Sequence, residues 1–132
     1  MTKHLQVRYA QLFFLLVLAS LSASQNANAQ QYAATANQCV RSYYDSNNYN
    51  WLTYQNTCSQ AIYVTMVSNA GTNVGALDLD PGGHGGPGLS ASEVRTLRGV
   101  EVYACPSGYY AVDTSDNRVS TRPVSTYRCK QS

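Results

Sequence analysis

The sequence has few charged residues and few of the large apolar side chains that fill most protein cores. Its 132 residues include 2 Phe, 2 Met and 1 Trp, and charged residues make up 12% of the chain. Proteins that bind nucleic acid electrostatically carry a marked basic excess. The small excess of 9 Lys plus Arg over 7 Asp plus Glu comes from Lys3 and Arg8 at the start of the chain. The remainder is neutral, which predicts no nucleic-acid partner.

Histidine is also scarce, because only His84 follows the first few residues. Any acid-base or triad chemistry must therefore use His84. A set of Ser90, His84 and either Asp80 or Glu93 lacks the nucleophile-elbow context that such a serine needs. We therefore predict no enzyme activity and no cofactor, and keep a hydrolase using His84 as an alternative. Calcium ligation by Asp78, Asp80, His84 and Glu93 is a further alternative, although the EF-hand spacing is missing.

Long apolar runs are absent as well. The longest, Leu12 to Ala19, is much shorter than the roughly 20 residues of a membrane-spanning helix. It follows basic residues and precedes Ala27-Asn28-Ala29, an A-x-A cleavage pattern. This order is typical of a secretory signal peptide over residues 1–29. We expect a secreted or periplasmic protein that has no membrane span after cleavage.

The cysteines point to the same compartment. All four, Cys39, Cys58, Cys105 and Cys129, follow the predicted cleavage site. An even number of cysteines in a small exported domain predicts disulfides, here two, and three pairings are open. Zinc is the competing use of four cysteines, but no Cys-x-x-Cys pair occurs. We predict no metal site.

The clearest local structure is a strand that follows Cys58. Strict alternation places Ile62, Val64 and Met66 on one face and Tyr63, Thr65 and Val67 on the other, which is typical of a half-buried strand. Further strand patterns cover Val74–Leu79, Val100–Cys105, Tyr109–Val112 and Tyr127–Cys129, with turns about every ten residues. They predict an all-β fold, a small disulfide-stabilised antiparallel β-sandwich or partly open barrel.

The domain boundaries follow from composition. Residues 30–38 lack any period and predict a flexible N-terminal arm, and residues 39–132 form a single β domain. Within it, Pro81–Gly88 holds five glycines and two prolines, which predicts an irregular loop. Ser90 and Glu93 have the spacing of a capping box, which predicts a short helical turn over Ser92–Leu97.

Three short motifs carry a resemblance. Asn56-Thr57-Cys58 begins a strand, Pro81-Gly82 makes a turn, and Cys105-Pro106 ends a strand. With them the chain resembles small exported bacterial proteins of unknown function. The cysteine, strand and glycine pattern also resembles the opening of thaumatin-like β-sandwich proteins, which are longer and richer in cysteine. Neither resemblance implies a catalytic residue.

The best candidate for a binding surface precedes the central strand. This segment combines flat rings with short amides in Tyr43, Tyr44, Tyr49, Asn50, Trp51 and Tyr54. Such side chains stack on sugars or extended peptides and bond their polar groups, although they serve equally as packing in a core poor in Phe. We expect a non-enzymatic module that binds a cell-envelope glycan or protein through this face. The alternative is an inhibitor or immunity-like protein that inserts Gly83, His84 and Gly85 into a partner's cleft.

A second surface candidate lies near the C-terminus. Basic residues gather there beside a single nearby acid, Asp116; they are Arg118, Arg122, Arg128 and Lys130. We interpret them as a solvated face whose charged pairs contribute little to stability.

Overall fold

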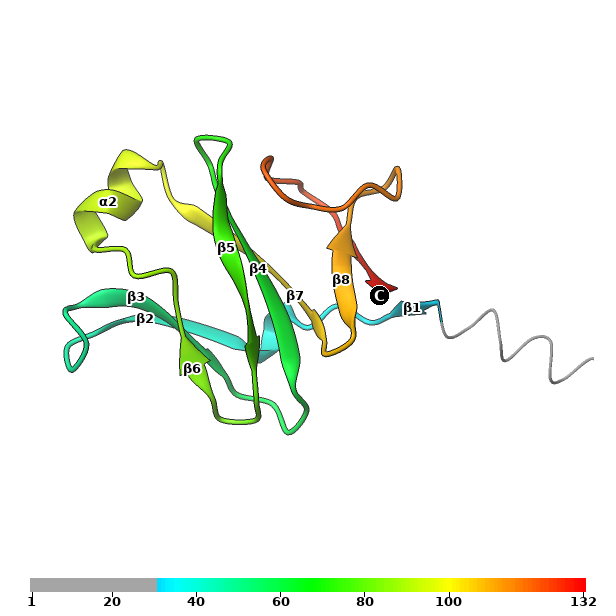
Figure 1. Cartoon of the computed structure of the whole chain (residues 1–132), viewed down its shortest axis with the longest axis horizontal. Helices are drawn as coiled ribbons and strands as arrows, with labels where there is room; N and C mark the ends of the chain where they lie inside the picture. Colours follow the sequence, from blue (N-terminus) through cyan, green and yellow to red (C-terminus); the bar gives the residue numbers. More distant parts are fainter. Residues whose placement is uncertain (1–30) are drawn as a thin grey trace, which may run out of the picture. The chain divides into compact units, whose positions relative to one another are not determined.

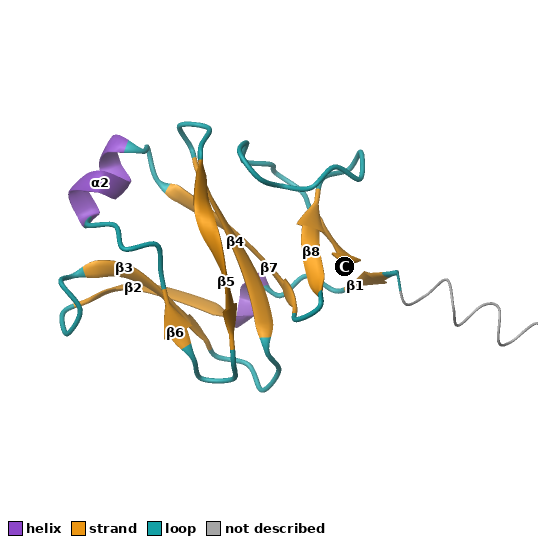
Figure 2. Ribbon diagram, viewed as in Figure 1, coloured by secondary structure: helices purple, strands orange, loops and turns teal. Residues whose placement is uncertain are grey.

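The computed structural model describes residues 31–132, of which Tyr32–Ser132 form one compact unit. The predicted signal peptide over residues 1–29 lies outside the described residues. The described part consists mainly of strands and loops (Figures 1 and 2). Its strands are β1 (Tyr32–Ala33), β2 (Val40–Asp45), β3 (Trp51–Asn56), β4 (Ile62–Ser68), β5 (Asn73–Leu79), β6 (His84–Gly85), β7 (Val100–Pro106), β8 (Tyr109–Val112) and β9 (Arg128–Gln131). Its helices are the 3₁₀ turn η1 (Asn37–Cys39) and α2 (Ala91–Thr96).

The strands form three antiparallel sheets of three strands each. Their orders are β2-β3-β6, β5-β4-β7, which we call the middle sheet, and β1-β9-β8, which we call the C-terminal sheet. Leu52 and Tyr54 from the first sheet pack with Ile62, Val64 and Met66 from the second in one apolar cluster. The predicted class, a small disulfide-stabilised antiparallel β fold, is confirmed.

The central strand β4 is buried on both faces. Its even-numbered residues face the cluster shared with β3, whereas Val67 packs with Tyr103, Ala111 and Cys129 in a second, smaller cluster. The prediction of a half-buried strand was wrong, because the C-terminal sheet covers the face that alternation assigned to solvent. Thr65 is buried on that face too.

The cysteines pair with their neighbours in sequence, Cys39 with Cys58 and Cys105 with Cys129. The second bridge joins β7 to β9 and so links the middle sheet to the C-terminal one. The predicted number of two disulfides is confirmed. Of the three disulfide pairings that the sequence left open, the structure contains this one.

The segment predicted as a loose N-terminal arm is largely built into the domain. Tyr32 and Ala33 pair with β9, and Ala36 is fully buried. The Asn37 side chain donates to the Val102 carbonyl at 3.0 Å and accepts from the Ala104 backbone at 2.7 Å. The segment lacks a period because it joins the domain through short pairings with strand edges and one buried alanine, and not through one face of a regular element.

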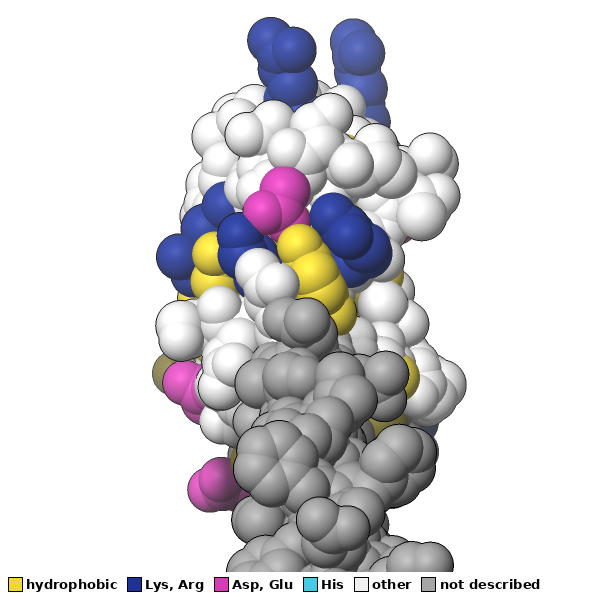
Figure 3. Space-filling view, turned by 90° about the vertical axis from the view of Figure 1, so that its right-hand side faces the viewer, with side chains coloured by type: hydrophobic (Ala, Val, Ile, Leu, Met, Phe, Trp, Pro, Cys, Tyr) yellow, Lys and Arg dark blue, Asp and Glu magenta, His cyan; other side chains and the backbone are white. Residues whose placement is uncertain are grey.

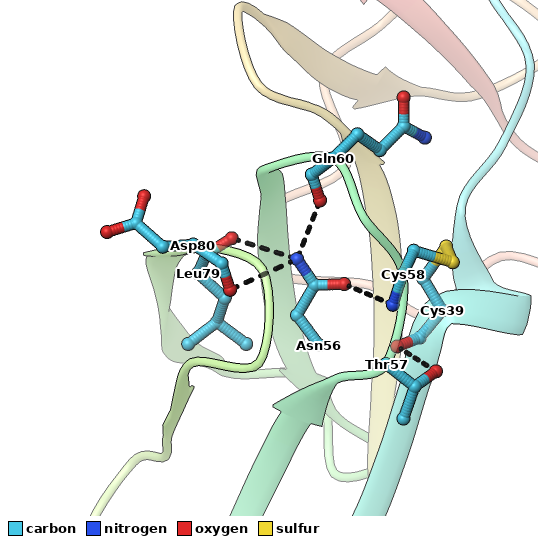
Figure 4. The surroundings of a disulfide bond; sticks show 7 residues. All are labelled: Cys39, Asn56, Thr57, Cys58, Gln60, Leu79 and Asp80. Atoms are coloured by element: carbon cyan, nitrogen blue, oxygen red, sulfur yellow. Dashed lines mark hydrogen bonds between the residues drawn. A yellow bond between two sulfur atoms is a disulfide. The ribbon is translucent and has the colours of Figure 1, made fainter.

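Asn56 links the loop between β3 and β4 to the end of β5, directly before Pro81–Gly88, which we call the glycine loop (Figure 4). Its buried amide nitrogen donates to the carbonyls of Gln60, Leu79 and Asp80 at 2.7, 3.1 and 3.2 Å. Its oxygen accepts from the Cys58 backbone at 3.0 Å. A single side chain thus satisfies backbone groups from two loops, beside the Cys39–Cys58 bridge.

Other local predictions match closely. Helix α2 has the full capping box, with the Ser90 hydroxyl accepting from the Glu93 backbone and the Glu93 carboxylate accepting from the Ser90 backbone. The helix is followed by Arg98 and Gly99 in left-handed conformation.

Candidate functional site

The sheet β2-β3-β6 presents two faces of different character. Cross-strand partners share a face, and the pairs are Tyr43 with Thr53, Asp45 with Trp51 and Gln55 with His84. Along β3 these residues alternate with Leu52 and Tyr54, which pack in the core, so their side chains point to the other side of the sheet. We call the side turned away from the core the outer face; it carries Arg41, Tyr43, Asp45, Trp51, Thr53, Gln55 and His84.

The predicted aromatic surface is therefore divided between the two sides of the sheet. Tyr43 and Trp51 lie on the outer face, whereas Tyr44 and Tyr54 lie on the side of the sheet that faces the core. Tyr54 is only 3% exposed. The prediction of a single aromatic face was wrong, because successive residues of a strand point to opposite sides of the sheet.

Tyr49 and Asn50 belong to the turn between β2 and β3. Asp45 holds this turn by accepting from the Asn47 backbone with its carboxylate and from the backbone of Asn48 and Asn50 with its carbonyl. Tyr49 and Asn50 both have a positive φ, of 56° and 54°. Asparagine tolerates this conformation, whereas a tyrosine there is strained.

The Tyr49 ring gains no core packing from this strained position. It is 80% exposed, and its neighbour is the partly buried Trp51 ring, with centroids 4.9 Å apart and planes tilted by 37°. A strained, exposed aromatic residue beside the only tryptophan marks the hairpin tip as a candidate binding surface.

The glycine loop lies along β3 and is partly regular. His84 and Gly85 form β6, paired with Gln55 and Tyr54, so the prediction of a wholly irregular loop over Pro81–Gly88 was wrong at these two residues. The loop continues along the same edge of β3, where the Leu52 backbone donates to the Leu89 carbonyl at 2.8 Å.

Gly86 allows this close approach, because a Cβ there would overlap the Leu52 carbonyl oxygen. At Gly88 a Cβ would lie in ordinary contact, 3.9 Å from the Trp51 ring, and glycine is favoured there by the positive φ of 71°. Gly86 thus permits backbone-to-backbone packing that no other residue fits. The loop is anchored to the sheet next to Trp51.

The anchored loop and the hairpin tip enclose a small hollow of about 180 Å³, which we call the tip hollow. It is lined by Trp51, Asn48, Thr53 and His84, together with Leu52 and the backbone of Gly85, Gly86 and Gly88. Residues with an indole, a side-chain amide and an imidazole thus meet around one space, beside the buried Thr53, whose hydroxyl donates to the Trp51 carbonyl at 3.0 Å. The structure brings together Trp51 from one predicted site and His84 from the other.

Two of the residues considered for hydrolase and calcium chemistry serve in a helix cap. Ser90 and Glu93 are engaged in capping α2, where the Ser90 backbone donates to the Glu93 carboxylate at 2.7 Å. No group of three or more His, Cys, Asp or Glu residues is placed to hold a metal ion within residues 31–132.

Basic side chains gather on the C-terminal sheet (Figure 3). Asp116 accepts from Tyr32, Arg128 and Lys130, and the hydrogen bond from Lys130, followed by that from Tyr32, lowers the pKa of its carboxyl. The Arg128 guanidinium lies 4.5 Å from the centre of the Tyr32 ring. Asp116 thereby ties β1 to β9, and these charges are used in exposed structural pairs.

Sequence reasoning missed Asn48 and Thr53 as members of the tip hollow. The alternation of side chains along β3 could have indicated Thr53, because Thr53 is two residues from Trp51 and so points to the same side of the sheet. Asn48 could be found only as part of the turn that Asp45 begins. The neighbourhood of His84 and Trp51 depends on pairing between β3 and β6, which has no local signature.

Comparison with known proteins adds no assignment, because no protein family, curated protein or solved structure matches the chain. The resemblance to small exported bacterial proteins therefore stays a prediction. No helix in the described part of the chain is long and apolar enough to cross a membrane.

Proposed function

We propose that this protein is an exported, non-enzymatic module that binds a cell-envelope glycan at the tip hollow and the adjoining outer face. The observation that carries the proposal is the pairing of Trp51 with the strained and exposed Tyr49 ring beside a hollow lined by polar groups. The C–H face of a sugar ring packs on an indole, and the sugar hydroxyls bond amide, hydroxyl and imidazole groups. Asn48 and His84 supply the amide and the imidazole, whereas Thr53 is 3% exposed and its hydroxyl donates to the Trp51 carbonyl at 3.0 Å, which holds the wall of the hollow in place.

The same geometry favours glycan binding over insertion of the glycine loop into a partner enzyme. Residues 84–89 lie along β3, with backbone bonds to it, instead of projecting from the domain. Among the described residues, the His84 side chain forms no hydrogen bond to a carboxylate or a hydroxyl. His84 is therefore proposed to contact ligand and not to serve in a triad.

Titration with peptidoglycan fragments and N-acetylglucosamine oligomers is expected to change the fluorescence of Trp51. By calorimetry, Trp51→Ala should weaken binding about tenfold, the loss expected for one aromatic stacking contact. Tyr49→Asn should also weaken binding while leaving the denaturation midpoint unchanged or raised, since asparagine relieves the strain at φ 56°.

Tyr44→Ala is the matched control, because Tyr44 is 44% exposed but has the opposite parity to Trp51. Its affinity for glycan should equal that of the unchanged protein. Equal loss of affinity in Tyr44→Ala and Trp51→Ala, or no binding across the glycan panel, would remove the tip hollow as the site.

Export is the second element of the proposal. Two disulfides are typical of an oxidising compartment, where they persist without reduction. The protein recovered from outside the cytoplasm is expected to begin at Gln30 and to contain no free thiol, as measured by intact mass and thiol titration. A recovered product that keeps residues 1–29 would contradict cleavage after Ala29.

A further inference from the structure

A second and larger hollow, of about 390 Å³, lies between β2, β3 and β7. Ser42 lines it from β2, Tyr54 from β3, and Val100 and Val102 from β7. We call it the inter-sheet hollow. Tyr54 packs in the core, whereas Trp51 lies on the outer face, so this hollow and the tip hollow lie on opposite sides of the β2-β3-β6 sheet.

One wall of the inter-sheet hollow is the open edge of β7, which is the last strand of the middle sheet. The main-chain groups of successive residues in an antiparallel strand point to alternate sides. The Ala104 carbonyl accepts from the Ala36 backbone at 2.9 Å, and the Ala104 N–H donates to the Asn37 side chain at 2.7 Å. Both groups of Ala104 therefore point away from β4. The main-chain groups of Val102 and Val100, two and four residues earlier, point the same way.

The chain itself begins an additional strand along this edge and then leaves it. The Asn37 side-chain amide accepts from the Ala104 N–H and donates to the Val102 carbonyl at 3.0 Å, as a peptide group of a paired strand would. After Asn37 the chain turns away through η1, which lies beside β7, and enters β2 (Figure 2). Within residues 31–132, the Val102 N–H and both main-chain groups of Val100 form no hydrogen bond. The uncovered part of the edge lines the hollow.

The β2 wall of the hollow is a strand edge too, because β2 is the first strand in the order β2-β3-β6. The Cys39 carbonyl accepts from the Thr57 backbone at 2.8 Å, so the odd-numbered residues that follow also bond to β3. The main-chain groups of Ser42 therefore point away from β3, and they form no hydrogen bond within the described part of the chain. Main-chain donors and acceptors from two strand edges thus line one space.

This lining selects a ligand with a peptide backbone. Unpaired N–H and C=O groups along a strand edge are the template on which an extended peptide adds to a sheet. The same hollow has apolar walls, to which Leu52, Val94 and the valines of β7 contribute. An extended peptide matches both parts, since its polar backbone runs along the edge while alternate side chains point to one side.

We infer that the inter-sheet hollow binds a short extended peptide segment of a partner protein, which continues along β7 the pairing that Asn37 begins. The peptide accepts from the Val102 N–H and bonds both main-chain groups of Val100. One apolar side chain of the peptide packs on Leu52 and Val94. The site neither requires nor contributes to glycan binding at the tip hollow.

Blocked tripeptides test the inference by nuclear magnetic resonance of the ¹⁵N-labelled protein. Acetyl-Thr-Leu-Thr-amide should shift the amide signals of Val100 and Val102 and slow the hydrogen exchange of the Val102 N–H, because that group gains an acceptor. The same peptide with every residue N-methylated keeps its side chains but cannot donate from its backbone, and should bind about tenfold more weakly. Acetyl-Thr-Asp-Thr-amide should also bind weakly, because it places a charge among apolar side chains.

Three results would overturn the inference. Equal binding of the N-methylated and unmodified peptides would show that the backbone is not recognised, and no shifts with any peptide would remove the site. Shifts of Val100 and Val102 on adding an N-acetylglucosamine oligomer, or on concentrating the protein alone, would assign the hollow to a glycan or to a second copy of the chain.

A variant that fills the hollow gives a second test. Ser42 is exposed at the hollow and shares a face of the sheet with Tyr54, so Ser42→Phe should block the peptide without disturbing the core. Ser59→Phe is the matched control, because Ser59 is an exposed serine outside the hollow, and it should bind the peptide normally. Equal loss of binding in the two variants would contradict the site. The N-methylated comparison uses the unchanged protein and does not depend on how either variant folds.

Discussion

Changing Asn56 to aspartate is expected to destabilise the domain by about 3–5 kcal/mol, the cost of leaving a buried charge without a partner. The Asn56 side chain is fully buried, and its amide nitrogen faces the carbonyls of Gln60, Leu79 and Asp80 (Figure 4). Aspartate places an anionic oxygen against those carbonyls and removes both donated hydrogens. The loss is a large share of the 5–15 kcal/mol that stabilises a typical domain. Urea denaturation followed by Trp51 fluorescence measures it.

The destabilisation should also depend on pH in a defined direction. Burial against carbonyl oxygens raises the folded-state pKa of the new carboxyl above its unfolded value of about 3.9. The folded variant then holds a proton that the unfolded chain has released, so stability falls as pH rises from the unfolded pKa through the folded one. The Asn56→Asp variant should therefore lie closer to the unchanged protein at pH 4 than at pH 8.

Asn73→Asp provides the control. Asn73 also donates from its side chain to a carbonyl, that of Ser120 at 2.9 Å, but at an exposed position. A charge there remains solvated and should change stability little. Equal urea midpoints for Asn56→Asp and Asn73→Asp would show that Asn56 does not hold the two loops together.

Asn56 also shows what short sequence motifs can and cannot predict. The sequence suggested Asn56-Thr57-Cys58 and Pro81-Gly82 as separate markers, each with its own local explanation. In the structure they meet: the Gly82 backbone donates to the Asn56 carbonyl at 2.9 Å, and the Asn56 backbone donates to the Gly83 carbonyl at 2.9 Å. The motifs could be found locally, but their contact depends on how β3 and β5 end in space.

The aromatic segment shows a different limit. Placing Tyr43 and Trp51 on one side needs the register between β2 and β3. The period of two was sufficient to separate Tyr43 from Tyr44 and Trp51 from Tyr54 within their own strands, so that division could be predicted. The addition of His84 to the Trp51 side could not, because β6 is two residues long and its pairing with β3 is set by glycines that allow close packing. Short edge strands carry too few side chains to leave a pattern.

The extent of burial was harder to predict than strand position. Alternation located β4 correctly, but the second apolar cluster that covers its other face includes residues from β7, β8 and β9. Strand β7 pairs with β4 along its length, and the Cys105–Cys129 bridge joins β9 to β7. Before the pairing is known, the sequence gives no reason to place the last strand against β4.

Removing the Cys105–Cys129 bridge, as Cys105→Ala with Cys129→Ala, is expected to cost about 3 kcal/mol through the entropy of the unfolded chain. The bridged cysteines are 24 residues apart, against 19 for Cys39 and Cys58. Loop entropy changes slowly with length, so the matched Cys39→Ala, Cys58→Ala variant should lose a similar amount by this effect. The two variants should differ in which part of the domain loses its structure.

The C-terminal sheet depends on its bridge more than the hairpin β2-β3 does. The apolar cluster beneath the C-terminal sheet is smaller than the one beneath the hairpin, and Cys105 and Cys129 are two of the six buried residues of that smaller cluster. The hairpin keeps the larger cluster and the Asn56 hydrogen bonds after the Cys39–Cys58 bridge is lost. Hydrogen exchange should therefore show lost protection at β8 and β9 in the first variant while β4 stays protected. Uniform loss across all three sheets in both variants would instead mean that the domain opens as one unit, with neither bridge serving a particular sheet.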